Sequence, residues 1–157
     1  LLALACVCAV FSSALADVLP EGFYGKWTNF DDENFDAYLS AKGYSWFTRR
    51  LITMATFEKE FTKTDDPKKF DYANLTTKKN VFYKGVDLGK EFIGEGLDST
   101  QHKVKFYMKD GIVYEHHLPT DPSSEAKEEE YGYYIEGEKL VVTMNEGNVS
   151  AKRFYKR

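Results

Sequence analysis

Apolar and polar residues alternate with a period of two over most of the chain after residue 55. Val104 and Phe106 share one face of such a segment, with lysine and tyrosine residues between and beyond them, which is the pattern of a half-buried strand. The dipeptide Asp110-Gly111 follows and is a strong signal for a tight hairpin, so Ile112 to Leu118 is predicted to return as the next strand. The period therefore predicts consecutive antiparallel strands.

Turn signals recur about every ten residues along this part of the chain, which suits an antiparallel all-β fold. The further signals are Asp65-Asp66-Pro67, Lys84-Gly85, Glu136-Gly137 and Glu146-Gly147-Asn148. Pro119 to Glu130, rich in Pro, Ser and Glu, is predicted to be a polar loop. With Phe23 to Asn29 as a first strand, the chain has one strand before its helical region and about nine after it.

Two short helices are predicted directly after the first strand. Asp31 to Glu33 offers an N-cap and acidic first-turn residues, Phe35 and Leu39 follow at helical spacing, and Gly43 ends the run. Ser45 to Ala55 has a second pattern with 3.6 residues per turn. So many strands without helical crossovers should close or nearly close, because open edges invite aggregation. We therefore predict one all-β domain.

Composition agrees with a strand-rich fold that has an apolar interior. The chain has 12 Phe, 11 Tyr and 2 Trp, residue types that strands and apolar cavities favour. The formal net charge is −4, without the basic excess that nucleic-acid-binding proteins carry, so no nucleic-acid partner is predicted.

Residues 1–16 are uncharged, mostly apolar, and too short to span a bilayer comfortably. They end at Ala16 in an Ala-Leu-Ala tripeptide that suits signal peptidase. We predict a signal peptide over 1–16, a mature domain over 17–157, and a secreted, extracellular protein; a buried strand or helix is the alternative. Because Cys6 and Cys8 both lie in this segment, the mature domain is expected to have no disulfide and no thiolate chemistry.

The last predicted strand, Asn148 to Arg157, places Val149, Ala151, Arg153 and Tyr155 on one face. If that face points inward, a guanidinium lies inside the fold, which is costly unless an anion pairs with it. A carboxylate matches a guanidinium bidentately. The alternative from spacing alone is a solvated charge near the chain end.

Three segments together resemble the cytosolic fatty-acid-binding protein family: Gly25-Lys26-Trp27, Asn34 to Leu39, and Arg153-Phe154-Tyr155. The leader, Asn74 to Lys79, and Leu97 to Lys103 are similar to the secreted nematode members of that family. The resemblance implies a ten-stranded antiparallel β-barrel, or β-clam, with a helix-turn-helix lid between the first and second strands. It also implies a monomeric carrier of a long-chain fatty acid, with no enzymatic activity and no cofactor.

The resemblance also implies roles for particular residues. The fatty-acid carboxylate is expected at Arg153, Tyr155 and Tyr133, and the acyl chain against Phe35, Tyr38, Leu39, Val142 and Met144, although each of these five could equally be ordinary core. Many family members have a second Arg, or a Gln, where this chain has Tyr133. In addition, Asn29 stands where the signature has an apolar residue.

Trp46, Phe47, Arg49 and Arg50 on the second helix resemble the family's portal, which in some members contacts anionic membranes. The alternative is a helix packed on the barrel rim with solvated arginines.

The chain also contains three histidines and two glycosylation sequons. No metal site is predicted, because the adjacent His116 and His117 point to opposite faces of a strand and cannot chelate together with His102. Asn74 and Asn148 each begin an N-glycosylation sequon in a chain expected to be secreted.

Other functions also fit parts of this sequence pattern. A lipocalin carrying a neutral lipid or a retinoid would also have a Gly-x-Trp near its start, but its main helix would follow the barrel and it would usually contain a disulfide. A ligand-free storage protein of an extracellular fluid is a third reading. A lipid-modifying enzyme would need a nucleophile or an acid–base pair, and the buried candidates are expected to be only tyrosines and one arginine.

Overall fold

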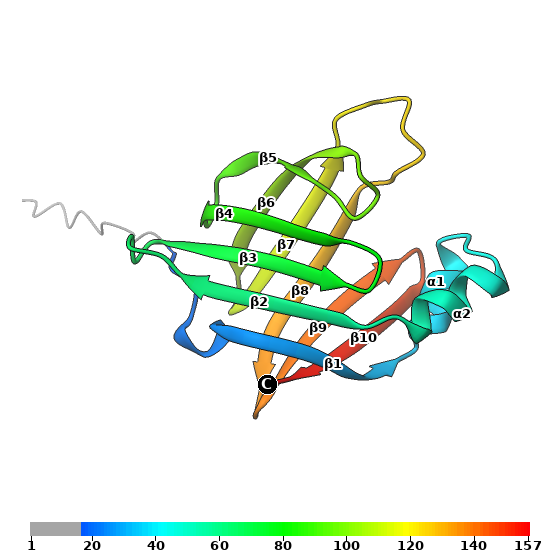
Figure 1. Cartoon of the computed structure of the whole chain (residues 1–157), viewed down its shortest axis with the longest axis horizontal. Coiled ribbons are helices and arrows are strands. Elements are labelled where there is room, and N and C mark those ends of the chain that lie inside the picture. The colour runs from blue at the N-terminus through cyan, green and yellow to red at the C-terminus, as the bar shows by residue number, and fades with distance from the viewer. Residues whose placement is uncertain (1–16) are drawn as a thin grey trace, which may run out of the picture.

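The computed structural model describes residues 17–157 and confirms the predicted fold class. Ten antiparallel strands form one sheet in the order β4-β3-β2-β1-β10-β9-β8-β7-β6-β5, and two helices lie at one end of it, between β1 and β2 in the chain (Figure 1). The sheet curves into a nearly closed barrel whose two edge strands are β4 and β5. Helices in this place do not suit the lipocalin alternative.

The elements have the following bounds: a 3₁₀ turn over Glu21–Phe23, β1 Gly25–Glu33, α1 Phe35–Ala41, α2 Trp46–Met54, β2 Phe57–Lys63, β3 Lys69–Thr76, β4 Asn80–Asp87, β5 Glu91–Glu95, β6 Gln101–Lys109, β7 Ile112–Pro119, β8 Glu129–Glu136, β9 Lys139–Glu146 and β10 Val149–Lys156. None of the helices in residues 17–157 has the length and apolar character that a membrane span requires.

The start of α1 differs from the sequence prediction. Asp31 to Glu33 does not cap the helix but continues β1, where Asp32 pairs with Arg153 of β10. A bulge after Asn29 shifts the register, and Asn34, in the left-handed region at φ 59°, turns the chain directly into α1. Pairing with β10 satisfies the backbone groups of this segment, and that outweighs its propensity to cap a helix.

The second helix begins and ends as predicted. Ser45 is its N-cap, with Oγ accepting a hydrogen bond from the Thr48 backbone N–H at 3.3 Å, and the helix ends at Met54. Gly43 separates the two helices at φ 94°, a conformation that favours glycine. While α1 packs against β10 and β9, α2 has no buried residue.

The Asp110-Gly111 hairpin is confirmed, with both residues at positive φ. By contrast, Lys84-Gly85 was predicted as a turn and instead lies inside β4. The β3–β4 register shifts there, and the Gly85 N–H donates to Asp71 Oδ1 at 2.8 Å. Glycine at positive φ marks a bulge in a strand as readily as a turn, so the local sequence did not distinguish the two.

Aromatic rings fill the barrel between its two halves. Phe106 of β6 is fully buried, and its ring lies 5.1 Å from that of Tyr72 and 5.6 Å from that of Phe70 on β3. The Phe61 ring of β2 lies 5.2 Å from Tyr72 and 6.0 Å from Tyr133 of β8. These contacts join strands from both halves of the sheet into one core, which agrees with the aromatic-rich composition.

The unpaired edges of β4 and β5 leave a cleft of about 530 Å³ between them. At one end of this cleft the Tyr83 hydroxyl of β4 donates to the Glu95 carbonyl of β5 at 2.8 Å. A side chain of β4 therefore bridges to β5, with which β4 has no strand pairing in the sheet of residues 17–157.

Candidate functional site

The last strand presents its predicted face to the interior. Ala151, Arg153 and Tyr155 are buried, with exposed fractions of 2%, 5% and 1%. The polar residues between them lie on the other face and are more exposed. The guanidinium of Arg153 therefore lies inside the barrel, and the alternative of a solvated charge is wrong.

Arg153 already has partners on β1. Its Nε donates to Asp32 Oδ1 at 2.8 Å, and its Nη2 donates to Asp32 Oδ2 at 3.3 Å and to Asn29 Oδ1 at 2.9 Å. The bulge in β1 aligns both acceptors with the guanidinium. Asn29, which departs from the family signature, thus serves as a hydrogen-bond acceptor for the buried cation.

Two aromatic rings cover the Arg153 guanidinium. Its central carbon lies 4.0 Å from the ring centroid of Phe35 on α1 and 4.3 Å from that of Phe57 on β2. Cation–π contacts of this kind stabilise a guanidinium in an apolar setting. The other residues predicted to line the acyl chain are also buried: Tyr38, Leu39, Val142 and Met144.

Tyr133 belongs to a chain of polar side chains that crosses the barrel. On one side its hydroxyl donates to Glu115 Oε2 of β7, and His117 Nε2 lies 2.6 Å from Glu115 Oε1. On the other side the hydroxyls of Tyr133 and Tyr72 are 3.2 Å apart, and Lys59 Nζ of β2 donates to the Tyr72 oxygen at 3.0 Å. Five polar groups are thus linked across the interior.

Three of these residues were missed by the sequence analysis. Lys59, Glu115 and His117 are buried, with exposed fractions of 7%, 3% and 7%, so the expectation that only tyrosines and an arginine are buried is wrong. Their position in the alternation was the available signal, since Lys59 falls between two inward phenylalanines of β2. Because charged residues are rarely buried, the alternation of β2 was not enough to predict that Lys59 faces inward.

Burial changes the ionisation of these groups. Burial alone would raise the pKa of Glu115, but hydrogen bonding and charge from His117, with Lys59 and Tyr133, lower it to about 2. Burial lowers the pKa of Lys59 to about 8, against the opposing effect of Glu115. Burial also raises the pKa of Tyr155 to about 12. At neutral pH the interior therefore holds one ionised glutamate and protonated tyrosines.

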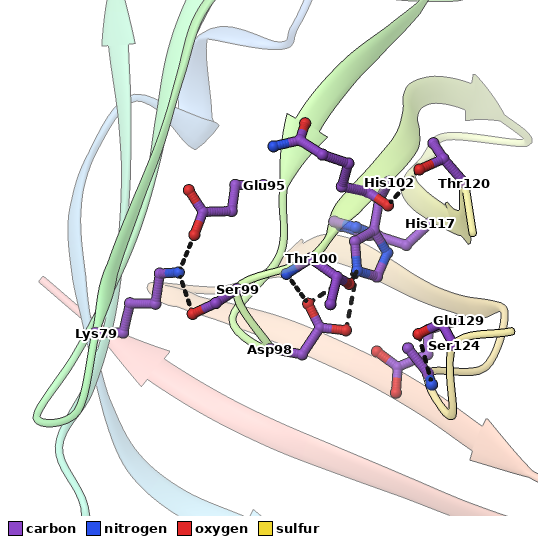
Figure 2. Close-up of polar contacts among 12 residues, drawn as sticks. Lys79, Glu95, Asp98, Ser99, Thr100, His102, His117, Thr120, Ser124 and Glu129 are labelled. Carbon is purple, nitrogen blue, oxygen red and sulfur yellow. Dashed lines mark hydrogen bonds and ion pairs between the residues drawn. The ribbon is translucent and has the colours of Figure 1, made fainter.

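The end of the β4–β5 cleft carries a separate polar cluster (Figure 2). His102 Nε2 lies 3.0 Å from both oxygens of Asp98 in the β5–β6 turn. Across the cleft, Lys79 pairs with Glu95 and donates to Ser99 Oγ at 2.6 Å, as Figure 2 shows. These contacts join the β3–β4 turn to the β5–β6 turn.

The adjacent histidines of β7 point to opposite faces, as predicted. His116 faces outward and its Nε2 lies 2.6 Å from Glu128 Oε1, whereas His117 faces inward. The ring of His117 lies 5.4 Å from that of His102. Within residues 17–157 no group of three or more His, Cys, Asp or Glu side chains is arranged to hold a metal ion.

The predicted portal residues of α2 divide into two sets. Trp46 and Phe47 are 67% and 66% exposed, and Arg50 is also exposed. Arg49 instead joins the helices, because its Nε donates to Asp36 Oδ1 and its Nη1 to the Tyr44 carbonyl, both at 2.9 Å.

The two sequons lie in different environments. Asn148 is exposed in the β9–β10 turn. Asn74 is partly buried within β3, and its Oδ1 is buried without a hydrogen-bond partner among residues 17–157. The predicted signal peptide lies outside the described residues.

Known proteins resemble the chain over nearly its whole length, although no family model matches it. The "Fatty acid-binding protein homolog 1" of Caenorhabditis elegans is 53% identical over 154 residues, which cover 98% of this chain and 96% of that protein. The structure of As-p18, described as an extracellular fatty acid binding protein, has a TM-score of 0.82 and 41% identity, covering 90% of this chain and 99% of As-p18. A Schistosoma mansoni fatty acid binding protein in complex with arachidonic acid has a TM-score of 0.69 and 28% identity, covering 87% of this chain and 96% of that one. The chain therefore belongs to the fatty-acid-binding protein family.

Proposed function

We propose that this chain is a secreted, monomeric carrier that holds a long-chain fatty acid non-covalently on the inner face of the barrel. The observation that carries the proposal is the buried Arg153 guanidinium on the inner face of a barrel that belongs to this family. The solved relative with bound arachidonic acid supports a fatty acid as the ligand class. The proposal includes no catalytic step and no cofactor.

The carboxylate in this proposal lies against Arg153 and Tyr155. Nε and Nη2 of Arg153 are engaged by β1, and none of the hydrogen bonds within residues 17–157 uses Nη1, so that nitrogen can donate to the ligand. The Tyr155 hydroxyl stays protonated at neutral pH, since its pKa is raised to about 12. Tyr133 donates to Glu115, so it would reach the ligand only by exchanging that bond or through a water.

The acyl chain supplies most of the gross affinity in this proposal. Each buried methylene contributes about 0.8 kcal/mol, whereas a charge-assisted hydrogen bond contributes roughly 1.5–3 kcal/mol. The inner-face residues Phe35, Tyr38, Leu39, Val142 and Met144 are our proposed lining. The head-group contacts then fix the orientation of the ligand and favour a free acid over a neutral lipid.

Native mass spectrometry of gently purified, secreted protein tests this function. We expect a chain that begins at Asp17, runs as a monomer, and carries a fatty acid, and we expect oleate to displace a fluorescent fatty acid from it. Persistent emptiness together with no binding of fluorescent lipid would contradict the proposal and favour the storage reading. A co-purified neutral lipid or retinoid would favour the alternative carrier.

We further propose that α2 makes transient contact with membranes during ligand transfer. Trp46, Phe47 and Arg50 present apolar and basic groups to solvent at the helical end of the barrel. Arg49 supports this surface indirectly by fastening α2 to Asp36 of α1. The alternative is a helix that only covers the rim.

Replacing both Trp46 and Phe47 with serine is expected to slow transfer of a fluorescent fatty acid to anionic vesicles about fivefold, because apolar area that would enter the lipid interface is lost. Stopped-flow transfer at several vesicle concentrations measures this effect. Phe82→Ser is the matched control, since Phe82 is 60% exposed on β4. Membrane contact would be contradicted if the wild-type transfer rate did not change with vesicle concentration or anionic lipid content.

A further inference from the structure

Arg153 and Lys59 are buried cations with different surroundings. Arg153 is 5% exposed and is neutralised by contact with the Asp32 carboxylate. Lys59 is 7% exposed, and within residues 17–157 no carboxylate forms a salt bridge with it. Its one hydrogen bond there is to the neutral hydroxyl of Tyr72. A buried ammonium without a contacting anion is costly, so this charge is the one that a ligand anion would relieve.

The direction of the hydrogen bonds shows which group of the polar chain can still donate. Glu115 is ionised and only accepts, so Tyr133 uses its proton on Glu115. The Tyr133 oxygen then accepts from Tyr72, and the Tyr72 oxygen accepts from Lys59. Both tyrosine protons are committed toward Glu115. The ammonium has three N–H groups and uses one of them here, so Lys59 is the end of the chain that retains donors.

The neighbours of Lys59 place it in the same interior region as the residues of β10. Lys59 Nζ lies 5.5 Å from the ring centroid of Tyr133, and Phe57, two residues earlier on the same face of β2, covers the Arg153 guanidinium. Asn74 is directly opposite Lys59 on β3, and its buried Oδ1 has no hydrogen-bond partner in the described part of the chain. This oxygen only accepts hydrogen bonds and offers nothing to a carboxylate, so the donors that a carboxylate could use here are the N–H groups of Lys59 itself.

We propose that Lys59 is a second cation that binds the ligand carboxylate, so that β2 as well as β10 determines the selectivity for free acids. The proposal rests on the carrier function proposed above and deepens it. Arg153 then acts with its charge already balanced by Asp32, whereas Lys59 gains its counter-ion only when an acid binds. A neutral ester or alcohol gives no such gain.

The pH dependence of binding follows from the groups that face Lys59. These are Tyr72 on β3, Tyr133 on β8, Glu115 on β7 and Arg153 on β10. The pKa values of both tyrosines are raised well above 10 by burial, that of Glu115 is about 2, and arginine stays charged. Between pH 7 and 10, therefore, Lys59 is the group in this set that titrates.

The direction in which oleate affinity changes with pH depends on whether the acid binds protonated or neutral Lys59 more tightly. In the empty barrel its pKa is about 8, and a bound carboxylate favours the protonated form and raises that pKa. Affinity for oleate should be constant between pH 7 and about 8 and then fall with rising pH, by at most about tenfold per pH unit. Affinity for methyl oleate should not fall in this range.

The experiment compares oleate and methyl oleate by displacement titration between pH 7 and 10. For Lys59→Met we expect oleate affinity at pH 7 to fall about tenfold or more, the alkaline decrease to disappear, and methyl oleate affinity to stay near that of the wild type. Lys26→Met on β1 is the matched control, because its side chain is 52% exposed. If Lys59→Met does not fold, the wild-type profiles of the two ligands still decide.

The outcomes separate the two proposals. Oleate affinity that stays constant to pH 10 in the wild type, or that Lys59→Met leaves unchanged, overturns the role of Lys59 while the carrier function stands. A wild-type protein that binds neither ligand at any of these pH values overturns both.

Discussion

Replacing Arg153 with leucine is expected to weaken oleate binding by about 10- to 100-fold, the equivalent of losing one charge-assisted hydrogen bond to the carboxylate. A neutral retinoid should lose much less, since its affinity comes from apolar burial. Asp32, the former partner, is 27% exposed and can be hydrated when the guanidinium is gone. Displacement titrations with both ligands measure the difference.

Lys156→Leu is the matched control for this change, because Lys156 is exposed and lies on the outer face of the same strand. It should leave both affinities near those of the wild type. Equal losses for oleate and the retinoid in Arg153→Leu would mean that the residue supports the barrel and does not anchor a carboxylate.

Replacing Asp32 with asparagine should affect stability and binding in opposite directions. The free energy of unfolding is expected to fall by about 3 kcal/mol, because the buried Arg153 loses the carboxylate that contacts it. Oleate affinity is expected to rise, by up to about tenfold, because the ligand carboxylate no longer competes with a protein carboxylate for the guanidinium. Urea denaturation and a displacement titration of the same preparation measure the two effects.

Glu33→Gln removes a charge from the next position of β1, where the side chain is exposed, and should change the free energy of unfolding by less than about 0.5 kcal/mol. The competition between Asp32 and the ligand would be refuted if Asp32→Asn lowered oleate affinity. A loss of stability no larger than that of the control would show that the ion pair contributes little to folding.

Arg153→Leu and Asp32→Asn therefore test the two partners of one ion pair. Arg153→Leu removes the cation that the acid needs, whereas Asp32→Asn removes its competitor. Lys59→Met examines the cation that has no such competitor among the described residues. Together they measure how the barrel divides its preference for acids between β10 and β2.

Much of the fold could be predicted from local patterns. The alternation around Val104 and Phe106 and the Asp110-Gly111 hairpin are confirmed, as are the bounds of α2. These features depend on a few neighbouring residues, because side-chain period, turn conformation and capping act over one or two turns of chain. Where glycine allowed two outcomes, as at Gly85, the local pattern failed.

Only part of the candidate site could be predicted from the sequence, because local patterns do not show which distant residues meet. The final strand placed Arg153 and Tyr155 on one face, and the structure confirms that this face is internal. The residues missed were Lys59, Glu115 and His117, whose burial makes sense only when they satisfy one another across the barrel. No single strand contains enough information to make a buried charge expected.

The sequence by itself determined an all-β chain with two helices after its first strand, and which residues of its last strand share a face, because a period of two is a property of each strand alone. Only the tertiary structure decided the partners of the buried charges. Asp32 and Arg153 are 121 residues apart, and they meet because a bulge in β1 shifts its register against β10. Register between distant strands is set when the whole sheet closes, so the electrostatics of the interior follow from closure rather than from any local segment.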